Sequence, residues 1–210
     1  MSNSPPREGS RATDIVVIGS GAAGMVAALT AVEEGAEVTL LEKASALGGT
    51  TAQSGAGIWI PNSRPVAEAV GETPREELLA YLRQTAGERV PEEKLETFID
   101  TGPDVIDFVE GNSPVEFQFA DYPDYHPEWR GGDIHGRMIE PTPYDATRLG
   151  DRVEHVRDNH HTPIPITIGE MMEGGQANFP TDEDLEIIRK RQEAGEMVKG
   201  EGLIMALYEA

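Results

Sequence analysis

The sequence predicts an α/β fold that opens with two parallel strands joined by a helix. Residues 14–18 (Asp-Ile-Val-Val-Ile) are a continuous, mostly β-branched run. Glycines and then an alanine-rich segment come next, before a second apolar run at residues 37–41. A strand, a helix and a strand within about thirty residues are typical of a right-handed β-α-β crossover, which makes the two strands parallel neighbours.

The first strand is expected to be buried on both faces, because parallel sheets are usually covered on both sides. The helix is expected over residues 22–34, with Gly35 ending it. Two strands and one helix do not complete a doubly wound domain. We therefore favour an incomplete α/β fold that is part of a larger enzyme. The alternative is that later segments of this chain supply the missing strands.

A mostly helical insertion is expected next. Its first helix, capped by Thr73, runs to residue 86. A second helix begins near Pro91, and Thr-Gly-Pro at residues 101–103 is expected to break it before a short helix that ends at residue 110.

The remaining chain mixes strands, loops and helices. Residues 115–119 alternate like a strand, residues 120–147 are expected to form a long ordered loop, and residues 158–181 look irregular. Helices are expected over residues 146–157, 182–194 and 202–210.

The composition excludes several classes of function. The net charge is −21, so the surface repels nucleic acid and anionic membranes. The chain has no cysteine, which excludes disulfides, thiolate catalysis, iron–sulfur clusters and a cysteine-linked flavin. We expect a flexible leader over residues 1–12, no membrane span, and a cytoplasmic location.

A glycine motif, G-x-G-x-x-G, lies at residues 19–24, directly between the first strand and the helix. Gly19 allows a tight turn, Gly21 lets the backbone approach a diphosphate, and Gly24 lets helix and strand pack closely. The helix N-terminus then presents N–H groups to the phosphates. The motif in this context predicts a dinucleotide site.

The residues after the second strand distinguish one dinucleotide from another. Glu42 ends that strand, where a carboxylate accepts hydrogen bonds from ribose hydroxyls and repels a 2′-phosphate. Small and hydroxyl residues then fill residues 46–57, which suits a flavin stretched along the chain. These features predict FAD, within a Rossmann-like FAD-binding unit.

At this point the sequence resembles a known family. The segments are DIVVIGSGAAGMVAAL at 14–29, LLEKASALGGTTAQSGAGIWIPNS at 40–63, PDYHPEW at 123–129 and HGRMIEP at 135–141. Together they resemble the FAD-dependent 3-ketosteroid Δ1-dehydrogenases, which belong to a wider flavoprotein group that includes soluble fumarate reductases.

The resemblance implies FAD contacts and one catalytic residue. In those enzymes a tyrosine in a Pro-Asp-Tyr loop assists a second tyrosine that removes a proton from the steroid A ring. Tyr125 matches the first of these. The cofactor-binding residues expected from the motif and the resemblance are Gly19, Ser20, Gly21, Ala22, Ala23, Gly24, Glu42, Lys43, Gly49, Thr50, Thr51, Ser54, Gly55, Ala56 and Gly57.

The resemblance also implies a domain division. Residues 13–72 are expected to form the N-terminal part of an FAD-binding domain, and residues 73–198 a helical and loop region that is partly a substrate domain. Residues 199–210 begin a return to the FAD-binding domain. The proton-abstracting tyrosine and a second flavin segment of those enzymes have no match in this chain.

Three functions therefore stand side by side. The first is 1,2-desaturation of a 3-oxosteroid, and the second is a fumarate-reductase-like reaction on a small unsaturated acid. The third is a truncated or split FAD-binding chain that is inactive without a second chain carrying the missing C-terminal half.

Other residues invite alternative interpretations. The five histidines are interpreted as loop residues, with no metal site expected and with His126 as an alternative pocket residue. Arg130, Arg137 and Arg148 could bind a substrate carboxylate, but we expect them to pair with Asp133, Glu140 and Asp151. The aromatic residues that could wall a steroid pocket, or simply pack in the core, are Trp59, Phe117, Phe119, Tyr122 and Trp129.

Overall fold

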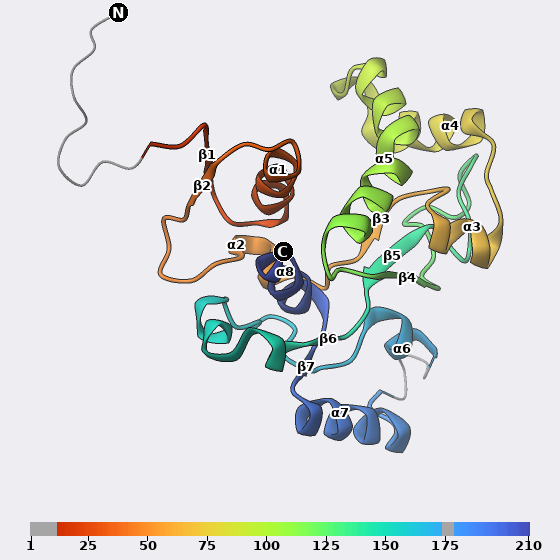
Figure 1. Ribbon diagram of the computed structural model, residues 1–210. Coiled ribbons are helices and arrows are strands. Elements are labelled where there is room, and N and C mark those ends of the chain that lie inside the picture. The colour runs from red at the N-terminus through yellow and green to blue at the C-terminus, as the bar shows by residue number, and fades with distance from the viewer. Residues whose placement is uncertain (1–11, 174–178) are drawn as a thin grey trace, which may run out of the picture.

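The computed structural model describes residues 12–173 and 179–210 (Figure 1). The expected leader lies almost entirely outside the described residues. Figure 1 shows the β-α-β unit at one end of the molecule and a helical region with a small sheet at the other, with the last helix between them.

The predicted β-α-β unit is confirmed. Strand β1 (Ile15–Ile18) pairs in parallel with β2 (Val38–Leu41), and α1 (Ala22–Glu33) connects them. Gly35 follows the helix with φ +86°, a left-handed conformation that glycine adopts without strain.

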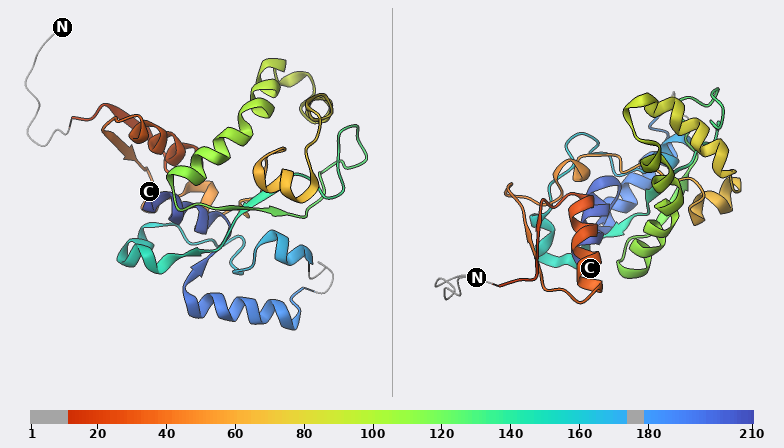
Figure 2. Two further views of the ribbon diagram at one scale, coloured as in Figure 1. Left: turned by 45° about the vertical axis from the view of Figure 1, so that its right-hand side comes forward. Right: turned by 90° about the horizontal axis from the view of Figure 1, so that it is seen from above.

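The expected burial of β1 on both faces is wrong. Ile15, Val16 and Ile18 are 41%, 52% and 84% exposed, and Leu41 on β2 is 51% exposed. The sheet has two strands, and no other described strand joins it. Helix α1 packs against this pair (Figure 2), and the exposed residues show that it covers only part of their aliphatic surface.

The segment after β2 carries short elements that lead into a second sheet. Helix α2 (Gly49–Ala52) precedes β3 (Ile58–Trp59), and α3 spans Arg64–Val70. The second sheet has the order β3-β5-β4, all antiparallel, with β4 at Phe117–Ala120 and β5 at Met138–Pro141. The strand expected near 115–119 is therefore confirmed, whereas the loop expected at 120–147 contains β5.

Helix α4 (Arg75–Ala86) begins as predicted but without the expected cap. Thr73 makes no capping bond; its N–H donates to Asn62 (2.9 Å) and its hydroxyl accepts from Arg137 (3.2 Å). The short turn η1 (Gly87–Arg89) follows α4. Thr73 is used to attach the helix start to neighbouring segments, which is a tertiary role that local sequence does not reveal.

The break expected at residues 101–103 is wrong. Helix α5 runs without interruption over Glu92–Asn112, with Pro103 inside it (Figure 2). Proline removes one backbone hydrogen bond there. Tertiary packing keeps the helix continuous: Ile99 and Ile106 are buried on either side of the proline, and Gly102 lies against Ile60.

The segment after β6 (Tyr144–Asp145) differs from the helix predicted at 146–157. It forms 3-10 turns, η2 (Ala146–His155), broken at Gly150, whose φ of +56° is incompatible with a helix. A short helix, α6 (Ile168–Glu173), lies within the segment expected to be irregular. The Gly174-Gly175 pair in that segment is outside the described residues.

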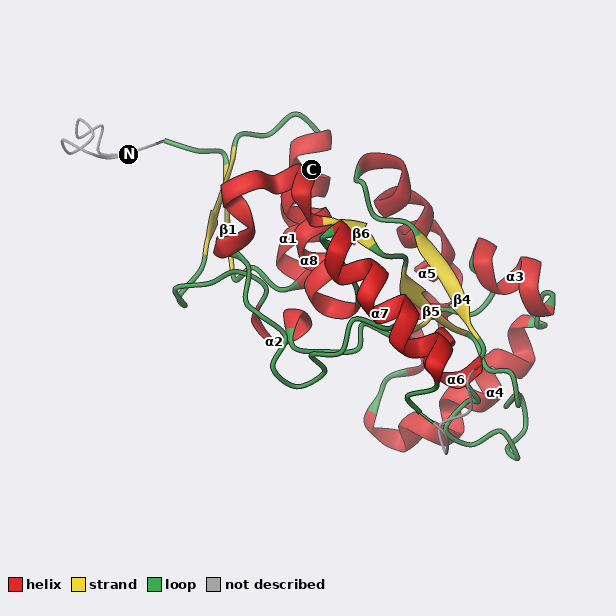
Figure 3. Ribbon diagram, turned by 90° about the horizontal axis from the view of Figure 1, so that it is seen from below, coloured by secondary structure: helices red, strands yellow, loops and turns green. Residues whose placement is uncertain are grey.

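The last two predicted helices are confirmed. Thr181 and Asp184 form a capping box at the start of α7 (Asp182–Ala194), so the acidic run there is a helix start. Strand β7 (Glu196–Met197) pairs with β6, and α8 spans Lys199–Glu209. Helices α6 and α7 lie on the underside of the molecule (Figure 3).

Helix α8 is the centre of the main core. Its residues 203–207 are all buried, and they pack with side chains of α1, α5, β5 and η2. A smaller cluster between α4 and α5 contains Leu78, Leu79, Leu95 and Ile99. Burial of aliphatic side chains in the main core joins the β-α-β unit to the rest of the chain.

Candidate dinucleotide site

The three motif glycines have the predicted geometry. Gly19 has φ +98°, and Gly21 is the N-cap of α1 in an extended conformation. A Cβ on Gly24 would lie 1.9 Å from the Gly19 carbonyl oxygen. Only glycine therefore lets the start of α1 approach the turn this closely.

A hydrogen-bonded chain joins this turn to the end of β2 and the start of α2. The Glu42 carboxylate accepts from the Ser20 N–H (3.0 Å) and hydroxyl and from the Ala44 N–H (2.8 Å). The fully buried Ser20 hydroxyl in turn accepts from the Gly48 N–H (2.9 Å). These bonds lower the pKa of Glu42 to about 2, the Ala44 N–H having the largest effect.

Helix α2 is attached to the first turn of α1. The Thr51 hydroxyl accepts from the Ala22 N–H (3.1 Å), which is among the donors that a helix start leaves unpaired. From the other side, Gly200 of α8 lies so close that a Cβ there would be 1.7 Å from the Thr51 carbonyl oxygen. Thr51 thus has a structural role beside the cofactor contact predicted for it.

The turn fits an extended dinucleotide. A Cβ placed on Gly19 or on Gly49 would meet no atom of the described chain within 4 Å, so open space lies in front of both backbones. The ionised Glu42 stands at the end of β2, where the sequence predicts a ribose acceptor. Lys43 beside it is exposed.

The small residues after α2 have a second explanation. The Ser54 hydroxyl bonds within its own turn, to the Thr51 carbonyl and the Ala56 N–H. A Cβ on Gly57 would lie 2.5 Å from the Met138 sulfur, and one on Gly55 would lie 3.2 Å from Ile168. Packing against the protein by itself accounts for the size of these glycines.

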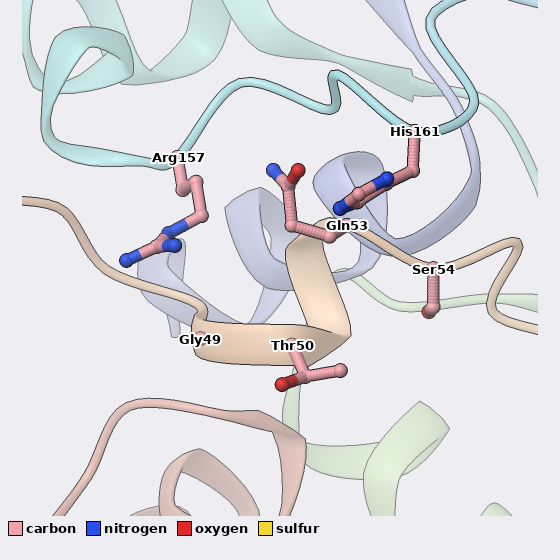
Figure 4. A pocket seen from close by; sticks show the side chains of 6 residues that line it. All are labelled: Gly49, Thr50, Gln53, Ser54, Arg157 and His161. Carbon is pink, nitrogen blue, oxygen red and sulfur yellow. The ribbon is translucent and has the colours of Figure 1, made fainter.

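A pocket beside α2 contains predicted and unpredicted residues. Gly49, Thr50 and Ser54 line it together with Gln53, Arg157 and His161 (Figure 4). Arg157 lies over the Gly49 end and His161 towards the Ser54 end. Sequence reasoning does not find these two, because each is separated from α2 by about a hundred residues and no local motif marks it.

Tyr125 lies on the loop between β4 and β5. Figure 1 shows β4 and β5 away from the β1–β2 pair. The Tyr125 side chain is 85% exposed, and the structure does not place it against the residues of the glycine turn. The tyrosine loop is linked to the small-residue segment through Trp59, whose indole N–H donates to Asp124 (2.8 Å).

Asp124 fixes the tyrosine loop from inside. Its buried carboxylate forms an ion pair with the buried Arg137 and accepts from the Asp133 N–H (3.1 Å). Burial is the largest influence on Asp124 and raises its pKa, against the opposing effect of Trp59 and Arg137. Nearby, the Tyr81 hydroxyl accepts from the His126 N–H (3.3 Å). Sequence analysis did not identify Asp124 or Tyr81.

The partners expected for three arginines are wrong, although all three are paired. Arg130 binds Glu77, Arg137 binds Asp124, and Arg148 binds Glu209. Glu140 instead accepts from the Ile168 and Gly169 N–H groups (2.6 and 2.9 Å) at the start of α6. The tertiary fold determines these partners, because it brings distant segments of the chain together.

The aromatic residues considered for a pocket wall are distributed over several places. Trp59 stacks on Tyr81 and Phe98, His126 stacks on Trp129, and Phe117 is buried in the main core. Phe119 packs against that core. Within the described residues there is no group of three or more acidic or histidine side chains that could hold a metal ion, and no helix has the length and apolarity of a bilayer span.

The glycine turn, the anchored carboxylate and the parallel β-α-β unit together define a dinucleotide-binding α/β protein. Comparison with known families agrees and is more specific. Residues 14–210 match the FAD binding domain family, and the chain belongs to it. The FAD prediction is thereby confirmed.

Two of the relatives are named as dehydrogenases of oxo compounds. The chain is 48% identical over 139 residues to 3-oxosteroid 1-dehydrogenase of Mycolicibacterium smegmatis, covering 65% of this chain and 24% of the relative. It is 37% identical over 199 residues to 4-oxocyclohexanecarboxylate 2-dehydrogenase of Sinomonas cyclohexanicum, covering 94% of this chain and 34% of the relative.

A solved structure shares the fold. It is the 3-ketosteroid delta1-dehydrogenase from Sterolibacterium denitrificans in complex with 1,4-androstadiene-3,17-dione, with a TM-score of 0.82 and 25% identity. The match covers 93% of this chain and 38% of that one. The chain thus spans about a quarter to a third of the length of the curated relatives described above.

Proposed function

We propose that this chain is the N-terminal part of an FAD-dependent oxidoreductase that introduces a double bond beside a ring ketone, with a 3-oxosteroid as substrate and C1–C2 as the bond. The observation that carries the cofactor part of the proposal is the chain of bonds from Glu42 through Ser20 to Gly48. These bonds place the Glu42 carboxylate, the predicted ribose acceptor, beside the open turns at Gly19 and Gly49. The 48% identity to a 3-oxosteroid 1-dehydrogenase supports the substrate part.

The chemistry needs a hydride acceptor and a means of removing a proton. FAD, when bound, supplies the acceptor. A tyrosine in water has a pKa of about 10, so its anion at pH 7 costs about 4 kcal/mol, and a second phenol that donates a hydrogen bond lowers that cost. Tyr125, on a loop fixed by Asp124, is proposed as that donor; the tyrosine it would assist has no match in this chain.

The experiment measures turnover with androstenedione and an artificial electron acceptor, with FAD supplied and with the chain complemented by a polypeptide that carries the second tyrosine. The proposal expects a 1,2-unsaturated product, with Tyr125→Phe lowering the rate about 10²- to 10⁴-fold while FAD binding stays unchanged. An FAD-loaded protein in which Tyr125→Phe turns over like the unmodified chain would disprove the role of Tyr125.

A second substrate has support of its own. The relative that covers 94% of this chain acts on 4-oxocyclohexanecarboxylate, a ring ketone without a steroid skeleton. 4-Oxocyclohexanecarboxylate should therefore be tested as a substrate in the same assay. The fumarate-type alternative, tested with fumarate and a reduced dye, has weaker support, because Arg130, Arg137 and Arg148 are already bound to carboxylates of the chain.

The third alternative, a chain that needs a second polypeptide, is supported by the exposed aliphatic residues of β1. Under it, the purified chain shows no turnover until a polypeptide carrying the missing strands and tyrosines is added. Turnover by this chain alone would rule the alternative out. Cytoplasmic location stays a prediction from sequence.

A further inference from the structure

The pocket beside α2 holds a positive charge that the glycine motif does not explain. The pocket has a volume of about 460 Å³, and Arg157 lines it together with Gly49, Thr50 and Ser54, which are three of the predicted FAD contacts. Figure 4 shows the Arg157 side chain extending past Gly49. Gly49 has no side chain to separate the guanidinium from a ligand.

Arg157 differs from most arginines of this acidic chain. Eight others have a carboxylate oxygen within 4.0 Å: Arg64, Arg75, Arg83, Arg130, Arg137, Arg148, Arg189 and Arg191. Within residues 12–173 and 179–210, no such carboxylate partner is found for Arg157, and its buried Nε has no hydrogen-bond acceptor. A buried donor on a cationic group is costly to leave unpaired.

The backbone around Arg157 is fixed on both ends of α2. Before α2, Leu47 and Arg157 are bonded directly: the Arg157 N–H donates to the Leu47 carbonyl (3.0 Å), and the Leu47 N–H donates to His155 (2.8 Å). After α2, the buried Asn159 side chain donates to the Ser54 carbonyl (3.2 Å). These bonds hold the backbone of Arg157 beside α2, and its side chain lines the pocket.

We propose that Arg157 binds a phosphate-type anion in this pocket, and that in the FAD-loaded protein this anion is the diphosphate of the cofactor. The second part rests on the function proposed above. FAD brings negative charge to a site where Glu42 is already ionised, in a chain of net charge −21. A guanidinium offers a planar fork of donors that matches phosphate oxygens and stays charged at every working pH.

The test measures binding by equilibrium dialysis for the unmodified chain, Arg157→Gln, Arg157→Lys and Arg152→Gln. Arg152 is the matched control: it lies in the same segment and loses the same charge, but its guanidinium lies over Tyr208, outside the pocket. The ligands are FAD, ADP and riboflavin, which separate the diphosphate from the flavin ring.

Arg157→Gln should weaken FAD and ADP about tenfold or more and leave riboflavin unchanged. Arg152→Gln should stay within about twofold, since a remote charge acts weakly through solvent. Arg157→Lys should keep part of the affinity. Unchanged FAD and ADP affinity in Arg157→Gln, or an equal loss for riboflavin, would overturn the assignment.

A second measurement separates this proposal from the first. If the unmodified chain takes up no FAD, the proposed function fails, and the anion site is then tested alone with inorganic phosphate. The Nε–H signal of Arg157 is followed by NMR, with circular dichroism to verify folding. A saturable shift at millimolar phosphate supports the site, and an unmoved signal overturns it.

Discussion

Single residues at the site act through bonds that the sequence did not show. Glu42 is predicted as a ribose acceptor, yet in the fold it also organises the turn, since Ser20 and Ala44 donate to it. Ser20 is predicted as a cofactor contact, but its hydroxyl is directed inward, between Glu42 and Gly48. Glu42 therefore has a structural role in the turn beside the ribose contact predicted for it.

The low pKa of Glu42 predicts a pH dependence of stability. The pKa of Glu42 is about 2 in the fold, against an ordinary value of 4.5 for a glutamate. The ionised carboxylate therefore stabilises the fold fully above pH 4.5, and this contribution is lost as the pH falls to about 2. The free energy of unfolding should therefore differ most between the unmodified chain and Glu42→Gln above pH 4.5. The two unfolding curves should converge near pH 2; a constant difference across this range would contradict the prediction.

Asp124 is expected to be far more important for stability than an exposed aspartate of the same loop. Asp124→Asn leaves the buried Arg137 without a counter-charge, which should cost about 3–5 kcal/mol in urea unfolding. Asp121→Asn is the control, because Asp121 is exposed and pairs with the exposed His135; it should change stability by about 0.5 kcal/mol or less. Equal effects of the two variants would show that the buried pair does not hold the loop.

At the scale of elements, close crossings of backbone decide the architecture of the site. Helix α8 lies against α2, and Gly200 makes that approach possible. Tertiary packing also determines helix α5, which stays continuous at Pro103 although the local sequence predicts a break there.

Gly200→Ala should separate α8 from α2. Its Cβ would lie 1.7 Å from a backbone oxygen, which cannot yield as a flexible side chain does, so a loss of about 1–3 kcal/mol is expected, together with weaker FAD binding.

Gly111→Ala is the control for that variant. Gly111 lies in α5 with nothing within 4 Å of an added Cβ, and the change should stabilise the chain by up to about 1 kcal/mol. Thermal unfolding of both variants, with FAD dialysis, measures the difference. If Gly200→Ala left the stability unchanged, the contact between α8 and α2 would not be tight.

At the scale of the whole molecule, the β1–β2 sheet exposes several aliphatic side chains. An exposed strand edge with aliphatic side chains is a template for pairing with another polypeptide. Helix α8 fills the main core, yet it leaves β1 open on the side away from α1.

Ile18→Lys is therefore expected to reduce self-association of the chain without lowering its stability. Ile18 is 84% exposed, so a lysine there meets solvent, and its charge opposes strand pairing. Val70→Lys, at a position 39% exposed on α3, is the control and should leave self-association unchanged. Sedimentation velocity over a range of concentrations makes the comparison; equal sedimentation of Ile18→Lys and the unmodified chain would contradict it.

Local sequence patterns correctly predicted several elements of the fold. The β-branched runs, the glycine spacing and the helix over residues 182–194 each depend on residues close in sequence, and each is found where it was expected. The FAD assignment rests on the same short segment and is confirmed by the family.

The sequence by itself therefore determined the dinucleotide unit and its cofactor, because a tight turn and a helix start depend on a few neighbouring residues. Only the tertiary structure decided the partners of Arg137 and Glu140, the placing of Arg157 over α2 and the exposure of β1. Those depend on which distant segments meet, and many pairings of arginine with carboxylate satisfy the same local sequence in a chain with 38 acidic residues.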